Sequence, residues 1–355
     1  MAVKFSVERT TSSKLEATDF SNLRFGDTFA DHMFESRYRD GGWDAGRILP
    51  YGAISLDPSF SVLHYGQAVF EGMKAFRYAG GKINIFRLDA HYQRFIRSCD
   101  RMNIAHVSRE VFEESIKQLV DIDRNWVPQD TYKSLYLRPF IFASDEFLGV
   151  RVARNYRYMV ITSPVGNYYA EGIKPIRLTT YPQYVRAVKG GTGEAKVPGN
   201  YAATMQPNAL AAQEGYAQVL WLDAFEQKYV EEVGTSNIFF LIDGTLITPP
   251  LEGTILPGIT RDSTMYLAGS WGIPVEQRKI SIDEVFEARD RGVLQEIFAT
   301  GTAAVVSPVG FIHHQGRSID MKQEQMGELA QRLYDTLTGI HHGSVEDPAD
   351  WCTLI

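Results

Sequence analysis

The chain has 355 residues, 44% hydrophobic and 22% charged, with a formal net charge of -7, which is typical of a globular protein with two domains. No basic face stands out and no apolar run approaches the ~20 residues of a membrane span, so we expect neither a nucleic-acid nor a membrane partner. Residues 1–20 lack a hydrophobic signal core, and Cys99 and Cys352 form no disulfide framework, so a cytoplasmic location is expected.

The first half of the chain is predicted to mix strands and helices. The Gly80-Gly81 pair separates two apolar runs and indicates a hairpin. Asp89 is expected to cap a helix that ends near Met102, because its carboxylate can accept hydrogen bonds from first-turn amides. Ser108 is expected to cap a second helix, which reaches about Trp126 along one apolar stripe. Buried strands are predicted at 134–142 and 156–164.

The second half begins after residues 165–175, which have turn formers at both ends and no periodicity and are therefore predicted to be a linker. Helices are expected at about 202–213, at 259–272, after a capping box formed by Ser281 and Glu284, and at about 321–338. The strands expected among them cover residues 176–181, 217–223, 228–233, 236–242 and 245–248.

These elements predict an α+β fold rather than a doubly wound sheet, because strands and helices do not alternate regularly. The predicted organisation is an N-terminal domain over 1–164, an interdomain linker over 165–175 and a C-terminal domain over 176–355. The sequence contains no internal repeat and no low-complexity tract.

The segment 190–201, GGTGEAKVPGNY, is the most informative part of the chain, because it places Lys196 among four glycines. A backbone with so few side chains lets a flat ligand lie close against it. A lysine amine there could form a covalent bond with a bound carbonyl, such as the aldehyde of pyridoxal phosphate. The alternative is a surface loop with a solvated amine, which is the common role of glycine-rich segments.

Other cofactors are less well supported. Gly191 and Gly193 match the first two glycines of a dinucleotide fingerprint, but Lys196 occupies the position of the third. The Gly-Lys-Ser/Thr ending of a P-loop is absent as well. The pairs His313-His314 and His341-His342 have no accompanying cysteine or carboxylate cluster, so no metal site is expected.

Pyridoxal phosphate also needs an acid to hold its pyridine nitrogen protonated. Glu232 lies at the end of a predicted strand and is a candidate for this role. Its neighbour Glu231 points to the opposite face of the strand, so only one of the two can face the ring. An isolated strand-end carboxylate is otherwise solvated.

The phosphate of the cofactor needs an anion site. The Pro257-Gly258 turn precedes a predicted helix whose first amides, at Ile259 and Thr260, could bind it. Arg94 could supply a forked positive charge, and Gly301-Thr302-Ala303 offers a second patch of small residues with a hydroxyl. A plain turn and a solvated helix arginine remain the alternatives for these residues.

Six motifs occur in order along the chain: LHYGQAVFEGMKAFR, SLYLRPFI, KGGTGEAKVPGNYAAT, EVGTSNIFF, LPGITR and TGTAAVVSPV. In this order they resemble the branched-chain amino acid aminotransferases, which are class IV pyridoxal-phosphate enzymes of fold type IV. The resemblance extends from about Phe25 to Trp351. It implies a small N-terminal α/β domain and a larger C-terminal domain with a mixed sheet and a barrel-like core.

The resemblance also implies roles for individual residues. Lys196 would bind the cofactor covalently, Glu232 would hold the pyridine nitrogen and Tyr201 would lie near the ring hydroxyl. The implied phosphate contacts are Arg94, Ile259, Thr260 and Thr302. The implied contacts of the substrate carboxylate are Thr235 and Ala303. The implied substrate pocket has the side chains of Phe25, Tyr65, Phe70, Tyr136, Arg138 and Tyr168, with Val150 and Leu148 on a loop from the other subunit.

By the same resemblance, the activity is transfer of the amino group of leucine, isoleucine or valine to 2-oxoglutarate, in a homodimer. An aromatic, dry pocket suits these side chains, because each buried methylene contributes about 0.8 kcal/mol. A D-amino acid aminotransferase, an aminodeoxychorismate lyase and a non-catalytic binding protein of this fold are the alternatives. Ala304 and Ser307 occupy the positions of a cysteine pair found in some relatives, so thiol redox control through that pair cannot operate here.

Overall fold

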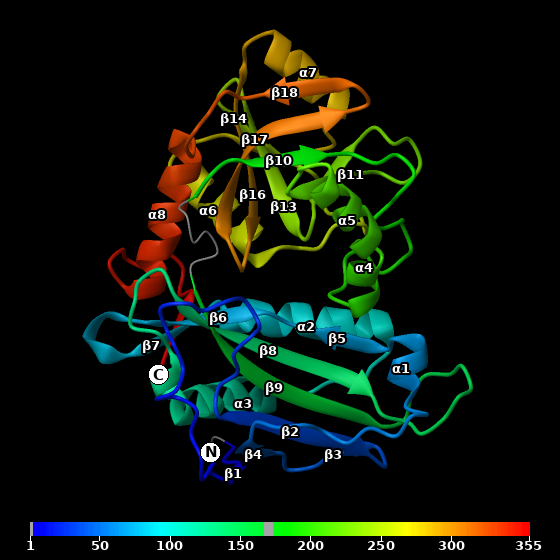
Figure 1. Ribbon diagram of the computed structural model, residues 1–355, viewed down its shortest axis with the longest axis vertical. Coiled ribbons are helices and arrows are strands. Elements are labelled where there is room, and N and C mark those ends of the chain that lie inside the picture. The colour runs from blue at the N-terminus through cyan, green and yellow to red at the C-terminus, as the bar shows by residue number, and fades with distance from the viewer. Residues whose placement is uncertain (1–2, 167–172) are drawn as a thin grey trace. The chain divides into compact units, whose positions relative to one another are not determined.

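The computed structural model describes residues 3–166 and 173–355, which form two compact units (Figure 1). The first unit contains residues 3–166 together with Ala195–Pro198 and Thr338–Ile355, and the second contains residues 173–194 and Gly199–Leu337. The domain limits predicted at 164 and 176 remain a prediction. The compact units differ from them in assigning two later segments, one of which includes Lys196, to the first unit.

The first unit is built on a sheet in which ten strands are described. Its main path runs β1-β4-β2-β9-β8-β6-β7-β19, with β3 beside β2 and β5 beside β8. The strands are β1 (Ser6–Val7), β2 (His32–Arg39), β3 (Gly42–Trp43), β4 (Arg47–Pro50), β5 (Ala68–Phe70), β6 (Met73–Arg77), β7 (Ile83–Phe86), β8 (Ser134–Ala143), β9 (Tyr156–Val165) and β19 (Cys352–Leu354). The C-terminal strand β19 pairs antiparallel with β7, which explains why the chain end belongs to this unit.

The predicted strands and hairpin of the first unit are confirmed. β8 and β9 pair antiparallel over their full lengths, and β6 and β7 form the hairpin that closes through the short helix η1 (Ala79–Gly81). Gly80 and Gly81 both adopt positive φ angles, which side-chain-bearing residues disfavour.

The first unit also contains the helices α1 (Ser61–Tyr65), α2 (Leu88–Met102), α3 (Arg109–Ile122) and η2 (Arg124–Trp126). The aromatic rings of Phe95 on α2, Phe112 on α3 and Tyr158 on β9 contact one another in the core, with centroid distances of 5.2 to 6.2 Å. Burying a side chain of this size contributes about 1.5–3 kcal/mol. The packing fixes α2 against the sheet, and α2 carries a predicted site residue, Arg94.

The predicted caps of α2 and α3 have different outcomes. Ser108 caps α3 as predicted, since its hydroxyl accepts from the amide of Val111 at 3.2 Å. The prediction for Asp89 is wrong. The helix begins two residues earlier than this cap would place it, at Leu88 after Arg87 in the left-handed conformation, and Asp89 lies inside its first turn.

The second unit contains a closed barrel. Its strands are β10 (Ile176–Thr179), β11 (Gln218–Leu222), β12 (Val230–Val233), β13 (Ser236–Ile242), β16 (Leu294–Gly301) and β17 (Val305–His314). Their pairing order is β12-β11-β10-β17-β16-β13, and a further β12–β13 pairing closes the circle. β14 (Thr245–Thr248) and β15 (Val275–Gln277) extend the sheet from β13, and β18 (Arg317–Asp320) pairs with β17. The barrel-like core expected from the family is therefore confirmed.

The helices that follow Lys196 are α4 (Pro198–Ala202), α5 (Met205–Gln213), α6 (Ile259–Ser270), α7 (Ile282–Asp290) and α8 (Glu328–His342). Ser281 caps α7 as predicted, through a 3.0 Å bond from the amide of Glu284. The last helix begins later than the predicted residue 321, because the carboxylate of Glu296 on β16 accepts from the amides of Leu329 and Ala330 and so caps it from a distant strand.

None of the helices in the described ranges is long and apolar enough to cross a membrane.

Candidate functional site

Lys196 is held through its backbone in the first unit. Its amide donates to the hydroxyl of Ser98 on α2 at 2.9 Å, and its carbonyl accepts from the amide of Phe70 on β5 at 3.1 Å. Its neighbours Ala195 and Val197 are buried in the same core. The position of Lys196 is therefore set by a helix and a strand that are far away in the sequence. This is unlike a mobile surface loop.

Two predicted site residues, Lys196 and Arg138, lie over the ring of Phe70. The ammonium nitrogen of Lys196 lies 5.0 Å from the ring centroid, and the guanidinium of Arg138 lies 4.7 Å from it. Arg138 also donates to the hydroxyl of Tyr136 at 3.0 Å, and the ring of Phe25 packs edge-on against Tyr136. Five predicted site residues are thus brought together in the first unit, as an apolar and aromatic surface that carries the amine of Lys196 and the guanidinium of Arg138.

Tyr65 and the loop after β8 form a separate group. The hydroxyl of Tyr65, at the end of α1, donates to the carbonyl of Leu148. Val150 on the same loop is 83% exposed, and Leu148 is 61% exposed. Tyr168 lies outside the described residues.

Arg94 projects from α2 and is 3% exposed. Its guanidinium makes a bidentate ion pair with the carboxylate of Glu71, through Nε at 2.7 Å and Nη2 at 2.8 Å. The alternative of a solvated helix arginine is therefore excluded. The carbonyl of Arg94 also accepts from Ser98, the residue that holds the backbone of Lys196.

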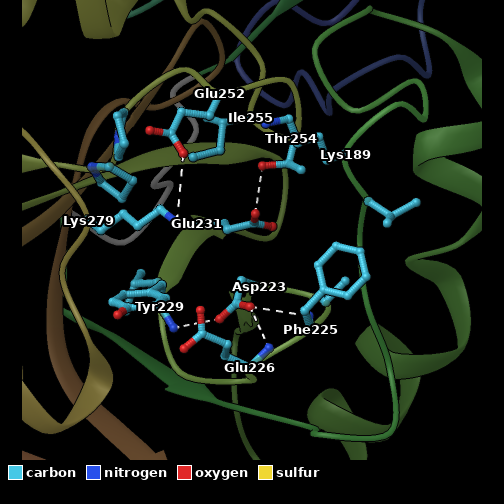
Figure 2. A pocket seen from close by; sticks show the side chains of 15 residues that line it. Lys189, Asp223, Phe225, Glu226, Tyr229, Glu231, Glu252, Thr254, Ile255 and Lys279 are labelled. Carbon is cyan, nitrogen blue, oxygen red and sulfur yellow. Dashed lines mark hydrogen bonds and ion pairs between the residues drawn. The ribbon is translucent and has the colours of Figure 1, made fainter.

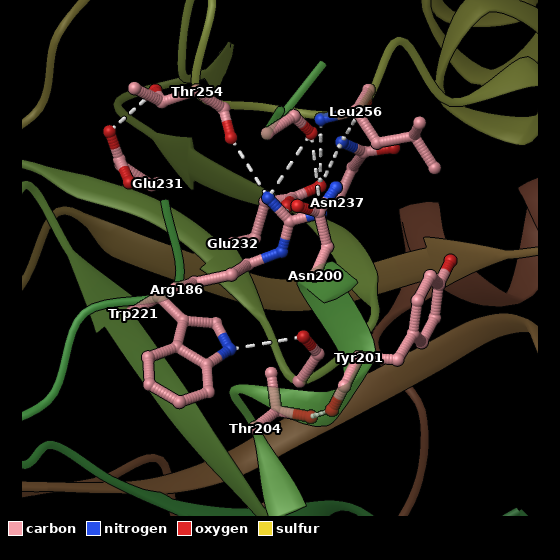
Figure 3. A network of polar contacts seen from close by, with 12 residues as sticks. Arg186, Asn200, Tyr201, Thr204, Trp221, Glu231, Glu232, Asn237, Thr254 and Leu256 are labelled. Atoms are coloured by element: carbon pink, nitrogen blue, oxygen red, sulfur yellow. Dashed lines mark hydrogen bonds and ion pairs between the residues drawn. The ribbon is translucent and has the colours of Figure 1, made fainter. Parts of the chain in front are cut away.

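In the second unit, Glu232 lies at the centre of a buried polar network (Figure 3). Its Oε2 is 2.7 Å from Nε of Arg186. Its Oε1 accepts from the side-chain amide of Asn237 at 3.2 Å and from the backbone amide of Leu256 at 3.3 Å. Glu232 is 1% exposed, so the alternative of a solvated strand-end carboxylate is wrong. The network can hold a charged carboxylate in a fixed orientation.

Arg186 connects this network to the glycine-rich segment. Its Nη1 donates to the carbonyl of Thr254 at 2.8 Å and to that of Gly193 at 3.4 Å. A side chain at Gly193 would collide with the backbone oxygen of Thr254. The close approach explains why a glycine is needed three residues before Lys196.

The predicted anion site, at the start of α6, lies next to Asn237, which donates a hydrogen bond to Glu232. α6 begins at Ile259, and among the described residues no side chain caps it. A Cβ atom at the preceding residue, Gly258, would collide with the amide oxygen of Asn237. The first amides of α6, at Ile259 and Thr260, with the helix dipole behind them, suit an anion.

Two turns that carry predicted site residues lie at the same end of the barrel. Thr235 is in the turn between β12 and β13, and Thr302 and Ala303 are in the turn between β16 and β17. β13 pairs with β16 so that Asn237 is opposite Thr300. Gly301 lies close to Ser236, because a Cβ atom added to Gly301 would be 3.0 Å from the hydroxyl oxygen of Ser236. The two turns are therefore neighbours.

Tyr201 lies in the short helix α4, where its carbonyl accepts from the hydroxyl of Thr204 at 2.8 Å. The neighbouring residue Asn200 ties α4 to the start of the glycine-rich segment. Its side-chain oxygen accepts from the hydroxyl of Thr192, and its side-chain amide donates to the carbonyl of Thr192.

Glu231 faces a different environment from Glu232, as strand alternation predicts. It lines a surface pocket together with Tyr229, Phe225 and Lys279, and its carboxylate accepts from the hydroxyl of Thr254 at 2.6 Å (Figure 2). Burial raises the pKa of Glu231. None of the predicted site residues lines this pocket.

Several residues that position the predicted ones were missed by the sequence analysis, namely Glu71, His91, Ser98, Arg186 and Asn237. Glu71 and Asn237 lie inside two of the family motifs, which was an available signal. Ser98 and Arg186 act on residues that are distant in the sequence, and no spacing rule connects them.

Comparison with known proteins identifies the family of the chain. Residues 68–312 match the family described as Amino-transferase class IV. The chain is 50% identical over 338 residues, 95% of each chain, to branched-chain-amino-acid transaminase 1 of Bacillus subtilis. It is also similar to the branched-chain amino acid aminotransferase of Escherichia coli, with a TM-score of 0.74 and 25% identity over 89% of this chain and 98% of that one. The branched-chain aminotransferase of the archaeon Thermoproteus uzoniensis with norvaline gives a TM-score of 0.73 and 27% identity over 90% of this chain and 98% of that one. The chain belongs to the class IV aminotransferases.

Proposed function

We infer that the chain transfers the amino group of leucine, isoleucine and valine to 2-oxoglutarate, with pyridoxal phosphate as its cofactor. The products are the branched-chain 2-oxo acids and glutamate. Similarity to branched-chain aminotransferases over nearly the whole chain carries this inference. A D-amino acid aminotransferase, an aminodeoxychorismate lyase or a non-catalytic binding protein is not favoured by it.

Each unit, taken by itself, has side chains that suit the cofactor. The first unit supplies a lysine whose backbone is fixed and an arginine whose guanidinium is oriented by a buried carboxylate. The second supplies a buried carboxylate in a charged network and an uncapped helix start among its described residues. Together these groups cover the lysine, the acid and the phosphate site that pyridoxal phosphate needs.

When it is bound, pyridoxal phosphate withdraws electrons from the substrate Cα and so makes its proton removable. Lys196 is assigned two roles: it binds the cofactor covalently at rest, and its amine then carries the proton from Cα. Glu232 is assigned the role of keeping a proton on the pyridine nitrogen. Support for this role comes from Arg186, Asn237 and Leu256, which fix the orientation of the carboxylate.

The remaining cofactor contacts are proposed from the family resemblance and supported by local geometry. Arg94, Thr302 and the first amides of α6, at Ile259 and Thr260, would hold the phosphate. Tyr201 would lie near the ring hydroxyl. The support for the α6 contacts is its uncapped start beside Asn237.

The proposed substrate pocket combines an apolar wall with one arginine. Phe70, Tyr136 and Phe25 offer aromatic surface for a branched aliphatic side chain. Arg138, stacked on Phe70 and bonded to Tyr136, could receive the distal carboxylate of 2-oxoglutarate. The other proposed contacts are Tyr65, Tyr168, Thr235 and Ala303.

A homodimer in the cytoplasm is the proposed state of the enzyme. The exposed apolar loop with Leu148 and Val150 supports a dimer in which this loop contributes to the partner's pocket. Both cysteines, Cys99 and Cys352, are free, which is compatible with a reducing compartment.

The function can be tested with purified enzyme, pyridoxal phosphate and a panel of L- and D-amino acids, with 2-oxoglutarate as acceptor. We expect glutamate formation with L-leucine, L-isoleucine and L-valine, and little with D-alanine. Preferential use of D-alanine would identify a D-amino acid aminotransferase. Release of pyruvate from aminodeoxychorismate would identify the lyase. A colourless protein that ignores added cofactor would identify a binding protein.

A further inference from the structure

The carboxylate of Glu71 lies at the centre of a buried cluster in the first unit. It accepts from Arg94 through two bonds, Nε to Oε1 at 2.7 Å and Nη2 to Oε2 at 2.8 Å. His91 lies one turn before Arg94 on α2, and its Nδ1 is 2.7 Å from Oε2 of Glu71. Glu71 is completely buried, and His91 is 2% exposed. A bidentate pair of this kind fixes the plane of the guanidinium as well as its position.

The backbone around Glu71 is fixed as well. Its amide donates to the carbonyl of Pro139 on β8 at 2.7 Å, and the amide of Gly72 donates to Oε2 at 3.1 Å. A Cβ atom at Gly72 would collide with the hydroxyl of Tyr136. The carboxylate therefore cannot shift without moving a central strand of the sheet.

The charge states of the cluster are set by burial and by its partners. Burial alone would raise the pKa of Glu71, but the charge and hydrogen bonds of Arg94, with the bond from His91, hold that pKa well below its usual value. Burial lowers the pKa of His91, so its imidazole is neutral at pH 7 and donates Nδ1–H to Glu71. The cluster is thus a carboxylate, a guanidinium and a neutral imidazole.

Such a cluster is a costly way to stabilise a fold. Removing an ion pair from water costs several kcal/mol per ion, and apolar residues of similar size often stabilise a core as well or better. What the cluster provides is orientation. Nε and Nη2 of Arg94 are paired with Glu71, and the guanidinium is planar and rigid. The pair therefore also fixes the direction of the third nitrogen, Nη1.

We propose that Glu71 is a positioning residue, which orients Arg94 as a preformed contact for the phosphate group of the cofactor, with His91 as its support. The proposal rests on the proposed function and goes beyond it, since it assigns a role to two residues that are not among the proposed cofactor contacts. α2 then links two parts of the site, because Arg94 lies one turn before Ser98, which holds the backbone of Lys196.

The test compares two aldehydes that differ only in the phosphate, pyridoxal phosphate and pyridoxal. Each is titrated into cofactor-free enzyme, and the covalent complex with Lys196 is followed by absorbance. For Glu71→Gln, we expect the dissociation constant of pyridoxal phosphate to rise about 10- to 100-fold, while that of pyridoxal changes less than about twofold. His91→Gln replaces the rigid imidazole that donates to Glu71 by a flexible amide and should give a smaller rise with the same selectivity.

Glu35→Gln is the matched control, because Glu35 is another buried carboxylate with an arginine partner, Arg37 at 2.9 Å, and lies on β2 of the same sheet. Both aldehydes should bind this variant as they bind wild type. Circular dichroism and thermal unfolding of each cofactor-free variant establish that it is folded.

Equal weakening of both aldehydes in Glu71→Gln and His91→Gln would overturn the proposal, because a general structural role weakens both. Unchanged affinity for pyridoxal phosphate would overturn it too. Failure of the proposed function is seen separately, in wild-type enzyme, as no covalent complex of pyridoxal phosphate at Lys196.

Discussion

Nε of Arg186 lies 2.7 Å from Oε2 of Glu232, with both side chains almost completely buried. The same guanidinium bonds to the carbonyls of Gly193 and Thr254. A buried carboxylate with an arginine partner remains charged, because loss of that charge would leave the guanidinium uncompensated. Arg186 therefore holds Glu232 in one orientation, as its proposed role beside a pyridine nitrogen requires, and at the same time anchors the segment that leads to Lys196.

The first prediction concerns the two adjacent glutamates of β12. Glu232→Gln should slow removal of the substrate Cα proton by about 100-fold or more while cofactor still binds, since an amide cannot stabilise a protonated pyridine nitrogen. Stopped-flow absorbance of the half-reaction with L-leucine measures this step. Glu231→Gln is the control and should stay within about twofold of wild type, because Glu231 lies on the opposite face of the strand. Similar rates for the two variants would refute the assignment.

The second prediction separates the two substrates. Arg138→Gln should raise the KM for 2-oxoglutarate by about 10- to 100-fold, the loss expected for a charged hydrogen bond. The KM for L-leucine, which has no distal carboxylate, should change much less. Steady-state kinetics with each substrate varied in turn give both values. An equal change for both substrates would show that Arg138 supports the pocket without selecting the acid.

The third prediction follows from the lowered pKa of Glu71 and needs no cofactor. Because the folded-state pKa lies below its usual value of 4.5, the ion pair stabilises the fold at pH above 4.5, and this contribution decreases as the pH falls below that value. Urea unfolding should show wild type more stable than Glu71→Gln at neutral pH, by at least about 1 kcal/mol. The difference should shrink between about pH 5 and pH 3.

A difference that stays constant over this range would contradict the charge state assigned to Glu71. The measurement should be repeated in about 0.5 M sodium chloride, because added salt screens a buried pair much less than a surface pair.

The fourth prediction tests the exposed loop. If Val150 lines the partner's pocket, Val150→Asp should lower activity about tenfold or more, since a charge in an apolar site is costly, while the thermal unfolding temperature is retained. Val7→Asp is a control at another exposed valine, in β1. Light scattering after size-exclusion chromatography gives the mass. A fully active monomer would refute the shared pocket.

The parts of the fold that the sequence predicted well depend on short-range relationships. Ser108 and Ser281 were found as caps because each bonds to an amide three residues ahead. The opposite environments of Glu231 and Glu232 follow from strand alternation alone.

What the sequence did not predict depends on residues far apart in the chain. The start of α8 is set by Glu296, a residue on another strand, so helical periodicity placed the start too early. No sequence signal marks the left-handed conformation of Arg87, so the sequence pattern predicts Asp89 as the cap instead. The ion pairs of Arg186 with Glu232 and of Arg94 with Glu71 require the folded chain, because 46 and 23 residues respectively separate the partners.

The most direct test of the account is to find where the cofactor becomes attached. Enzyme saturated with pyridoxal phosphate is reduced with borohydride, digested and analysed by mass spectrometry. We expect one label, on Lys196. The variant Lys196→Ala should carry no label at residue 196 and should have no transaminase activity. A label on another lysine such as Lys74 or Lys189, or normal turnover by Lys196→Ala, would contradict it.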